Sequence, residues 1–342
     1  MSLIQKYRPE IDGLRAVAVI SVMGFHFDRS FFSGGSLGVD IFFVISGFLI
    51  TSIISNEFYE THYFNYVAFI LKRIRRLIPA LSFLILFYWT FCPILWPSFS
   101  GRRTPDAVVT ALYLTNIRQI YIPSENPLSH TWSLSIEEQY YVVWPWILLF
   151  LLRFSRQTAA TILLIAWTTL TIVRPVWAHF IGGQWAYYFT PLHATGLVIG
   201  SALALKPIKI RAGAAAFLTL LGTLLWGHTE IFGLYEIPIA EILTIFIISE
   251  TPKLLSARPL RIVGRASYGI YLWHIPIAWA WTLPLPLGFM TLPLISIGAG
   301  IISHWGVERW FLSRKDKLPT DRDAISGVSE HEPSKLGTQQ KA

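Results

Sequence analysis

Long apolar runs recur along the chain as far as residue 307, and they constrain the fold more than any other feature. A helix needs about 20 apolar residues to cross the hydrocarbon layer of a membrane, and most of these runs approach that length. Hydrophobic residues make up 53% of the 342 residues and charged residues only 14%, whereas soluble domains carry about 25% charged residues. A water-soluble core cannot bury that much apolar surface, so the sequence predicts an integral membrane protein.

The apolar runs predict an all-α integral membrane protein, a bundle of about ten transmembrane helices with no soluble domain. Residues 1–311 form the predicted membrane domain, and the polar residues 312–342 lack periodicity, which is typical of a disordered tail. No internal repeat is evident. The predicted helices cover 12–29, 37–55, 77–96, 132–152, 157–178, 186–205, 212–229, 235–250, 267–283 and 289–307.

The distribution of basic residues predicts the orientation of these helices. With the N-terminus in the cytoplasm, 23 of the 28 Lys and Arg residues face inward, as expected for a multi-pass protein of a bacterial cytoplasmic membrane. Both termini are then cytoplasmic. The short apolar segment 107–121 is expected to be re-entrant or interfacial, because counting it as a crossing would place most basic residues outside. The five basic residues predicted on the outer side are Arg29, Arg102, Arg103, Arg118 and Arg174.

Two other compositional features exclude classes of site. The lone Cys92 lies in an apolar run, so no internal disulfide and no thiolate metal site is expected. The net charge of +8 comes from basic residues between apolar runs rather than from one amphipathic face. Membrane lipid is therefore an expected partner, and nucleic acid is not.

The first predicted helix carries two functional candidates, Arg15 and His26. They are 11 residues apart, which places them about 16 Å apart along a helix and within about 20° of the same face. Arginine binds phosphate bidentately, and a histidine can remove a proton from a hydroxyl that attacks a thioester. This geometry suits a long anionic donor such as coenzyme A entering from the cytoplasm. The alternative is that Arg15 marks the membrane boundary and His26 is a hydrogen-bonded interior histidine.

The basic cluster KRIRR (72–76) comes immediately before a predicted helix, where the helix dipole also favours anions. Arg73 and Arg76 are therefore candidates for holding the phosphates of the donor. The alternative is a topological cluster that faces anionic lipid headgroups.

Two adjacent carboxylates, Glu137 and Glu138, follow the start of the fourth predicted helix. Neighbours on a helix point about 100° apart, so only one of them can face a given cavity. Glu138 is the candidate that orients His26 or the acceptor, and Glu137 is a candidate for substrate binding. The alternative is the ordinary preference of helix N-termini for acidic residues. Asp40 and His274 are further buried candidates for substrate binding, although each is more often structural when taken singly.

Taken together, these segments resemble the membrane acyltransferase 3 family, which includes the O-antigen and exopolysaccharide O-acetylases of bacteria. Arg15 through His26 is similar to the basic-x10-His signature of that family, and Arg73 through Arg76 resembles its RxxR element. The resemblance spans residues 7 to about 311. The segments that carry it, in order, are YRPEIDGLRA (7–16), GVDIFFVISGFLI (38–50), RIRR (73–76), HTWSLSIEEQYY (130–141) and SYGIYLWH (267–274).

The resemblance implies that an acyl group, most often acetyl, moves from cytoplasmic acetyl-coenzyme A to a carbohydrate hydroxyl, with Arg15 and His26 essential. The carbohydrate could belong to lipopolysaccharide, an exopolysaccharide or a lipid-linked intermediate, and direct transfer and an acyl-enzyme both stay open. Many relatives add an extracytoplasmic domain after the membrane part, so this chain is expected to work alone or with a separate extracytoplasmic partner. Where relatives often carry an arginine before Leu197, this chain has TPLH (190–193), so a role of that arginine in binding donor or acceptor is not expected to carry over.

The rival hypothesis from another class is a glycan or lipid transporter without covalent chemistry. Buried charge in a helical bundle fits both functions. A secondary transporter more often shows inverted repeats and paired broken helices, which the sequence does not reveal. The presence of both Arg15 and His26 also argues against a member of the fold that has lost catalysis. The leading hypothesis is therefore an O-acetyltransferase.

Overall fold

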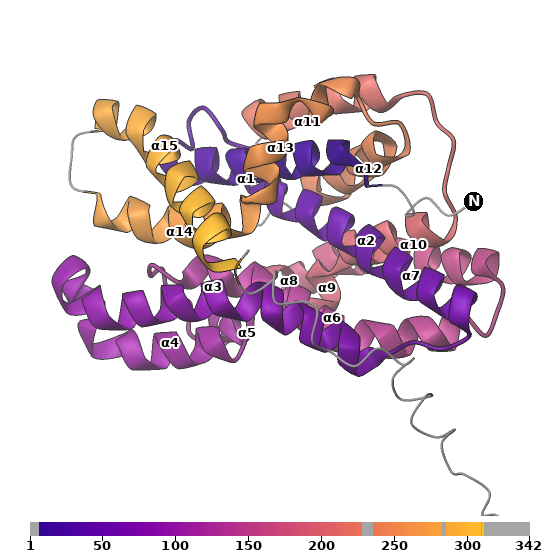
Figure 1. Ribbon diagram of the computed structural model, residues 1–342, viewed down its shortest axis with the longest axis horizontal. Coiled ribbons are helices and arrows are strands. Elements are labelled where there is room, and N and C mark those ends of the chain that lie inside the picture. Colours follow the sequence, from indigo (N-terminus) through magenta and orange to yellow (C-terminus); the bar gives the residue numbers. More distant parts are fainter. Residues whose placement is uncertain (1–6, 228–234, 282–284, 309, 311–342) are drawn as a thin grey trace, which may run out of the picture.

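The computed structural model describes residues 7–227, 235–281, 285–308 and 310, and these residues form helices and connecting segments without a strand. Most helices run roughly along the long axis of the molecule (Figure 1). Among these described residues, three helical segments are both long and apolar enough to cross a membrane, namely Gly35–Thr61, Tyr66–Leu95 and Arg156–Ile181. The all-helical fold is confirmed, whereas the count of ten spans stays a prediction. The expected tail at 312–342 lies outside the described residues.

The centre of the bundle is formed by α1 (Pro9–Phe27), α2 (Gly38–Thr61) and α10 (Thr195–Leu205). Glycines allow α2 and α10 to approach closely. A Cβ atom on Gly47 would lie 2.0 Å from the carbonyl oxygen of Leu197, and one on Gly200 would lie 2.1 Å from that of Val44. Small residues at such crossings are typical of membrane helices, because the attraction between helices in lipid comes from close packing.

A second group of helices comprises α3 (Tyr66–Leu95), α4 (Arg103–Ala111), α5 (Thr115–Tyr121), α6 (Trp132–Leu151) and α7 (Arg156–Ile181). The segment 107–121, expected to be re-entrant or interfacial, forms most of the short helices α4 and α5, which have nine and seven residues. Each is too short to cross a membrane. Asp106 anchors this pair by accepting hydrogen bonds from Arg118 on α5 and, at 2.9 Å, from the hydroxyl of Tyr88 on α3.

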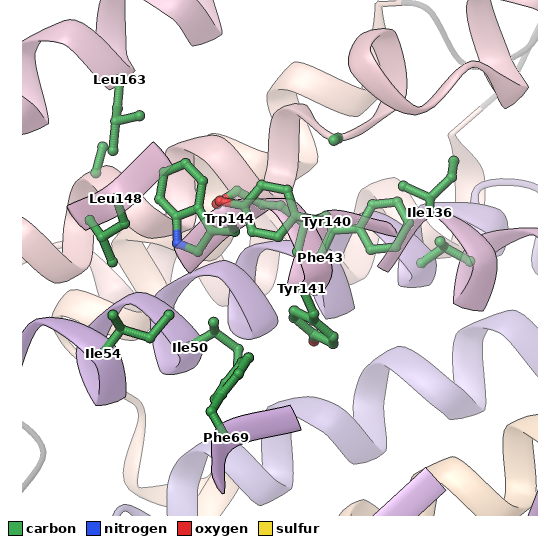
Figure 2. Packing of buried hydrophobic residues seen from close by; sticks show 14 of the residues in the cluster. Phe43, Ile50, Ile54, Phe69, Ile136, Tyr140, Tyr141, Trp144, Leu148 and Leu163 are labelled. Atoms are coloured by element: carbon green, nitrogen blue, oxygen red, sulfur yellow. The ribbon is translucent and has the colours of Figure 1, made fainter. Parts of the chain in front are cut away.

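Side chains of α6 form hydrogen bonds and ring contacts that connect the two groups of helices. The Tyr140 and Trp144 rings stack with centroids 4.8 Å apart, and the indole of Trp144 donates to Thr51 of α2 at 2.8 Å. Thr51 in turn donates to Ser201 of α10 at 2.7 Å. Figure 2 shows Tyr140 and Trp144 among apolar side chains of α2 and α6. The polar atoms of Tyr140, Trp144, Thr51 and Ser201 all have hydrogen-bond partners here, as burial in an apolar environment requires.

The C-terminal half contains five further helices, of which α13, α14 and α15 pack against α1, while α12 packs against α2 and α11. Helix α14 packs against α15, and α13 packs against the start of α1, where a Cβ on Gly264 would lie 1.7 Å from the carbonyl oxygen of Asp12. A π-helical turn, His304–Glu308, follows α15. The five helices are α11 (Gly213–Trp226), α12 (Glu236–Ser249), α13 (Arg258–Arg265), α14 (Ser267–Ala280) and α15 (Leu285–Ser303).

Two helix predictions are wrong. The helix expected at 77–96 begins eleven residues earlier, at Tyr66, because Asn65 caps it by accepting a hydrogen bond from the backbone of Ala68 at 2.9 Å. The helix expected at 186–205 is broken into α8 (Gly183–Tyr188), α9 (Thr190–His193) and α10. Phe189 is extended there, and Pro191 lacks the N–H that a continuous helix would need.

Candidate active site

A cavity of about 780 Å³ lies where α1 ends, α2 and α6 begin and α14 passes. His26 and Asp40, two of the residues singled out from the sequence, line this cavity. The rest of the lining combines aromatic rings with hydroxyl, amide and charged groups. It includes Phe25, Arg29, Gln119, Ser124, Glu125, His130, Trp132, Gln184, Tyr187, Tyr188, Tyr271 and Trp279. Such a mixture can bind a polar molecule with apolar faces, because rings stack on the faces while polar groups bond to hydroxyls.

Three histidines from three different helical segments lie close together beside this cavity, and two of them, His26 and His130, line it. The ring centroid of His274 on α14 lies 5.3 Å from that of His26 on α1 and 5.1 Å from that of His130 in the 3₁₀ turn Ser129–Thr131. His26 is exposed to the cavity, whereas His130 and His274 are buried. Sequence reasoning selected His26 and His274 but not His130, although His130 opens the motif that continues to Glu137 and Glu138. Within the described residues, no group of His, Cys, Asp and Glu side chains has an arrangement that could hold a metal ion.

Asp40 is buried at the cavity floor, as the sequence predicted, and its partner is His193. The Nε2 atom of His193 lies 3.2 Å from Oδ1 of Asp40, and Nδ1 contacts the carbonyl oxygen of Tyr187. His193 is thus the residue that holds Asp40. The ring of Tyr187 packs against His193 at 4.5 Å and forms part of the cavity wall.

A second buried carboxylate, Glu241 on α12, lies near Asp40 and was not identified from the sequence. It accepts hydrogen bonds from Thr195 and from the indole of Trp167, both at 2.6 Å. Arg174 interacts with it electrostatically. Arg174, counted among the basic residues expected on the outer side, lies within α7 and is fully buried, and its side of the membrane stays a prediction. A hydrophobic run in the sequence does not indicate which oppositely charged residue will lie near an isolated charge in the folded protein.

A separate polar group joins α2, α3 and α6 deeper in the bundle. Glu137 accepts hydrogen bonds from Ser46 on α2 and from the hydroxyl of Tyr141, and the guanidinium of Arg73 lies 4.1 Å above the Tyr141 ring. Glu138 interacts electrostatically with Arg73 and Arg76. Glu138 therefore lies beside the arginines of α3, and no described contact joins it to His26. Its predicted role in orienting His26 has no support in the described contacts, and Glu137 and Glu138 do not line the cavity.

Arg15 and His26 lie on one uninterrupted helix, as the spacing required. Arg15 is half-buried, its guanidinium lies 6.0 Å from the centre of the Phe42 ring, and its Nε is buried without a hydrogen-bond partner. Arg15 does not line the cavity that contains His26. A buried guanidinium nitrogen without a partner costs free energy, which an anionic ligand can offset.

The predicted location of the KRIRR cluster is corrected by the start of α3 at Tyr66. Residues 72–76 lie in the second and third turns of this helix rather than before its N-terminus. The helix dipole acts within the first turn and contributes little there. Any anion would be held by the guanidinium groups of Arg73 and Arg76 themselves.

Comparison with known proteins decides the family. The model of the acyltransferase family described as "Acyltransferase domain" matches residues 8–306, which is most of the chain. The chain belongs to this family. The matched range includes every site residue named above, so the resemblance inferred from the ordered motifs is confirmed.

Curated relatives of this family member include three bacterial proteins. O-acetyltransferase OatA of Staphylococcus aureus is 36% identical over 310 residues, covering 80% of this chain and 51% of that protein. Peptidoglycan O-acetyltransferase OatA of Listeria monocytogenes is 34% identical over 330 residues, covering 85% and 52% respectively. The putative peptidoglycan O-acetyltransferase YrhL of Bacillus subtilis is 32% identical over 313 residues, covering 80% and 49%. The chain spans about half the length of these relatives, and no solved structure matches it.

Proposed function

We propose that this protein is an O-acetyltransferase that transfers an acetyl group from cytoplasmic acetyl-coenzyme A to a hydroxyl of a cell-envelope polysaccharide. The observation that carries the proposal is the arrangement along α1, where Arg15 lies deep in the bundle and His26 faces a wide polar cavity about 16 Å away. Donor and acceptor can therefore approach the reacting centre from opposite ends.

The proposed binding of the acetyl donor depends on three arginines. Arg15, Arg73 and Arg76 supply guanidinium groups that can bind the phosphates of coenzyme A bidentately. The buried Nε of Arg15 that lacks a partner, and the interaction of Glu138 with Arg73 and Arg76, indicate that these cations lie in a partly desolvated environment. An anion gains more from a guanidinium there than in bulk water, because the effective dielectric is lower.

The proposed binding of the polysaccharide acceptor depends on the cavity. A sugar ring has apolar faces and polar edges, and the cavity offers the rings of Trp132, Tyr187 and Trp279 together with the amides of Gln119 and Gln184. The names of the relatives favour peptidoglycan as the acceptor, rather than the lipopolysaccharide considered from the sequence alone.

The chemistry that we propose is general-base catalysis by His26. A ring nitrogen of His26 takes the proton of the acceptor hydroxyl while the oxygen attacks the thioester carbonyl. The carbon–sulfur bond then breaks, the thiolate of coenzyme A leaves, and the proton held by His26 finally neutralises that thiolate. Asp40 contributes to acceptor binding from the cavity lining, whereas His274, which the sequence also offered for substrate binding, is fully buried and does not line the cavity.

We further propose a multi-pass protein of the bacterial cytoplasmic membrane with both termini in the cytoplasm and about ten spans. The excess of Lys and Arg in the segments assigned to the inside supports this topology. In this orientation the cavity opens outward, toward the polysaccharide, and Arg73 and Arg76 lie toward the source of the donor.

The test is the O-acetyl content of the envelope polysaccharide in cells with the gene, without it, and with the His26→Ala variant. The proposal expects O-acetyl groups to be lost on deletion and restored only by the wild-type gene. Purified protein should transfer labelled acetyl from acetyl-coenzyme A to muramyl oligosaccharides. A protein that transports the glycan without acetylating it would contradict the proposal.

A further inference from the structure

The hydrogen bonding of His274 fixes the position of the proton on its imidazole ring. His274 is fully buried in α14, and its Nδ1 lies 2.6 Å from the carbonyl oxygen of Tyr271. A carbonyl oxygen only accepts hydrogen bonds, so Nδ1 carries the proton. In the neutral ring, Nε2 is then a lone-pair acceptor.

This acceptor is buried and has no hydrogen-bond partner. The aromatic rings in contact with His274 belong to His26, Phe27, His130 and Tyr271. Phe27 has no polar group. The Tyr271 hydroxyl is already engaged with the hydroxyl of Ser133 at 2.6 Å and the carbonyl of His130 at 2.7 Å. Among these rings, the N–H donors available to Nε2 are those of His26 and His130.

His130 has another acceptor nearby. Pro276 lacks an N–H, so it cannot form the helical hydrogen bond to the carbonyl of Leu272, four residues earlier. This carbonyl interacts with the His130 ring, although neither ring nitrogen makes a hydrogen bond of ordinary geometry. His130 therefore has backbone acceptors of its own close by, at Leu272 and Tyr271, which leaves His26 as the remaining donor to His274.

The distance between His26 and His274 suits this role. Their ring centroids are 5.3 Å apart with an interplanar angle of 51°, so a nitrogen of one ring can reach the other directly or through one water. His26 is exposed to the cavity, where a water and an acceptor hydroxyl can both reach it. The charged or titratable groups that face His26 are Arg29, His130 and His274.

We propose that His274 is a positioning residue for the transfer reaction, which accepts a hydrogen bond from His26 and thereby fixes the tautomer of the catalytic base. With one nitrogen of His26 committed to His274, the other presents its lone pair to the cavity, where it removes the proton of the acceptor. In serine proteases an aspartate holds the histidine in this way. Here a neutral imidazole takes that place, while Glu137 and Glu138 are engaged elsewhere. The inference rests on the proposed function.

The experiment compares two substitutions at His274 in purified full-length protein in lipid nanodiscs, with acetyl-coenzyme A and a muramyl oligosaccharide as substrates. His274→Leu removes the acceptor and should lower kcat about 10²-fold while changing KM for either substrate less than about threefold. His274→Gln retains a carbonyl oxygen that can accept from His26 and should keep at least about ten times the kcat of His274→Leu. Trp273→Phe is the matched control, because this neighbour packs against Phe83 and Phe87 of α3 instead, and it should behave as the wild type.

Equal kcat for His274→Leu and the wild type, or equal losses for His274→Leu and His274→Gln, would overturn the inference. If His274→Leu does not fold, His274→Ala with added imidazole replaces it. Recovery of turnover by about tenfold supports the positioning role, and no recovery overturns it. The wild-type measurement distinguishes a failure of the proposed function from a failure of the positioning role. Inactive wild-type protein refutes the proposed function, whereas active wild-type protein whose kcat does not change on substitution of His274 refutes only the positioning role.

Discussion

The Nε2 atom of His193 lies 3.2 Å from Oδ1 of Asp40, and this contact joins the short helix α9 to α2 at the floor of the cavity. The other ring nitrogen of His193, Nδ1, donates a hydrogen bond to the carbonyl oxygen of Tyr187. His193 thus holds the cavity-lining carboxylate and a wall residue at once. The lining of the cavity therefore depends on His193, which does not itself line it.

His193→Ala should leave Asp40 buried without this partner and lower the free energy of unfolding by about 1–3 kcal/mol, the usual cost of an unsatisfied buried group. Thermal unfolding of purified protein measures the loss. His179→Ala, at an exposed position near the end of α7, is the control and should melt with the wild type. An unchanged melting temperature for His193→Ala would show that Asp40 is stabilised by other contacts.

His26→Ala should reduce acetyl transfer by about 10² to 10⁴-fold, the usual contribution of a general base. The variant should still insert into the membrane and bind acetyl-coenzyme A, because Arg15, Arg73 and Arg76 are intact. Turnover in membranes and calorimetric binding of the donor separate the two effects. Near-normal turnover would refute the base assignment and favour a direct attack or a different base.

Arg73→Lys combined with Arg76→Lys should weaken acetyl-coenzyme A binding clearly, because lysine keeps the charge but loses the planar fork that matches phosphate. Arg75→Lys is the matched control: it lies in the same turn of α3 but does not interact with Glu138 as Arg73 and Arg76 do. Equilibrium binding of acetyl-coenzyme A is the measurement. Unchanged affinity in the double variant would mean that this basic cluster sets only the membrane topology and does not bind the donor.

Gly47→Val should destabilise the crossing of α2 and α10, because even the first added carbon would lie 2.0 Å from a backbone oxygen. Gly222→Val on α11 is the matched control, since nothing lies within 4 Å of a Cβ there. The yield of folded protein after detergent extraction and its melting temperature should fall for Gly47→Val alone. Similar behaviour of both variants would mean that the helices can separate without penalty.

Alkaline phosphatase fused after Arg314 should be inactive, since the charge distribution predicts a cytoplasmic C-terminal segment. The same enzyme fused after Ser100, in the segment between α3 and α4, should be active. The two fusions together test the orientation. High activity after Arg314 would overturn the ten-span count.

The sequence alone determined the features that depend on local periodicity. Arg15 and His26 share a face of one helix because their spacing and an uninterrupted apolar run require it, and the structure keeps them on α1. The membrane class and most helix positions follow from the length of the apolar runs in the same way. The family follows from the order of its motifs. The start of α3 did not follow from the apolar runs. Once Asn65 has capped this helix, it continues through charged residues as readily as through apolar ones.

Only the tertiary structure decided which polar groups meet. His130 and His274 are 144 residues apart in the sequence, yet their rings lie 5.1 Å from each other beside the cavity that His26 lines. Glu138 interacts with the arginines of α3 rather than with His26, and Arg174 is buried near Glu241. Long-range pairings depend on how helices rotate and cross, and an apolar run specifies neither. Close contacts at Gly47, Gly200 and Gly264 set those crossings, and the crossings decide which buried polar groups lie near one another.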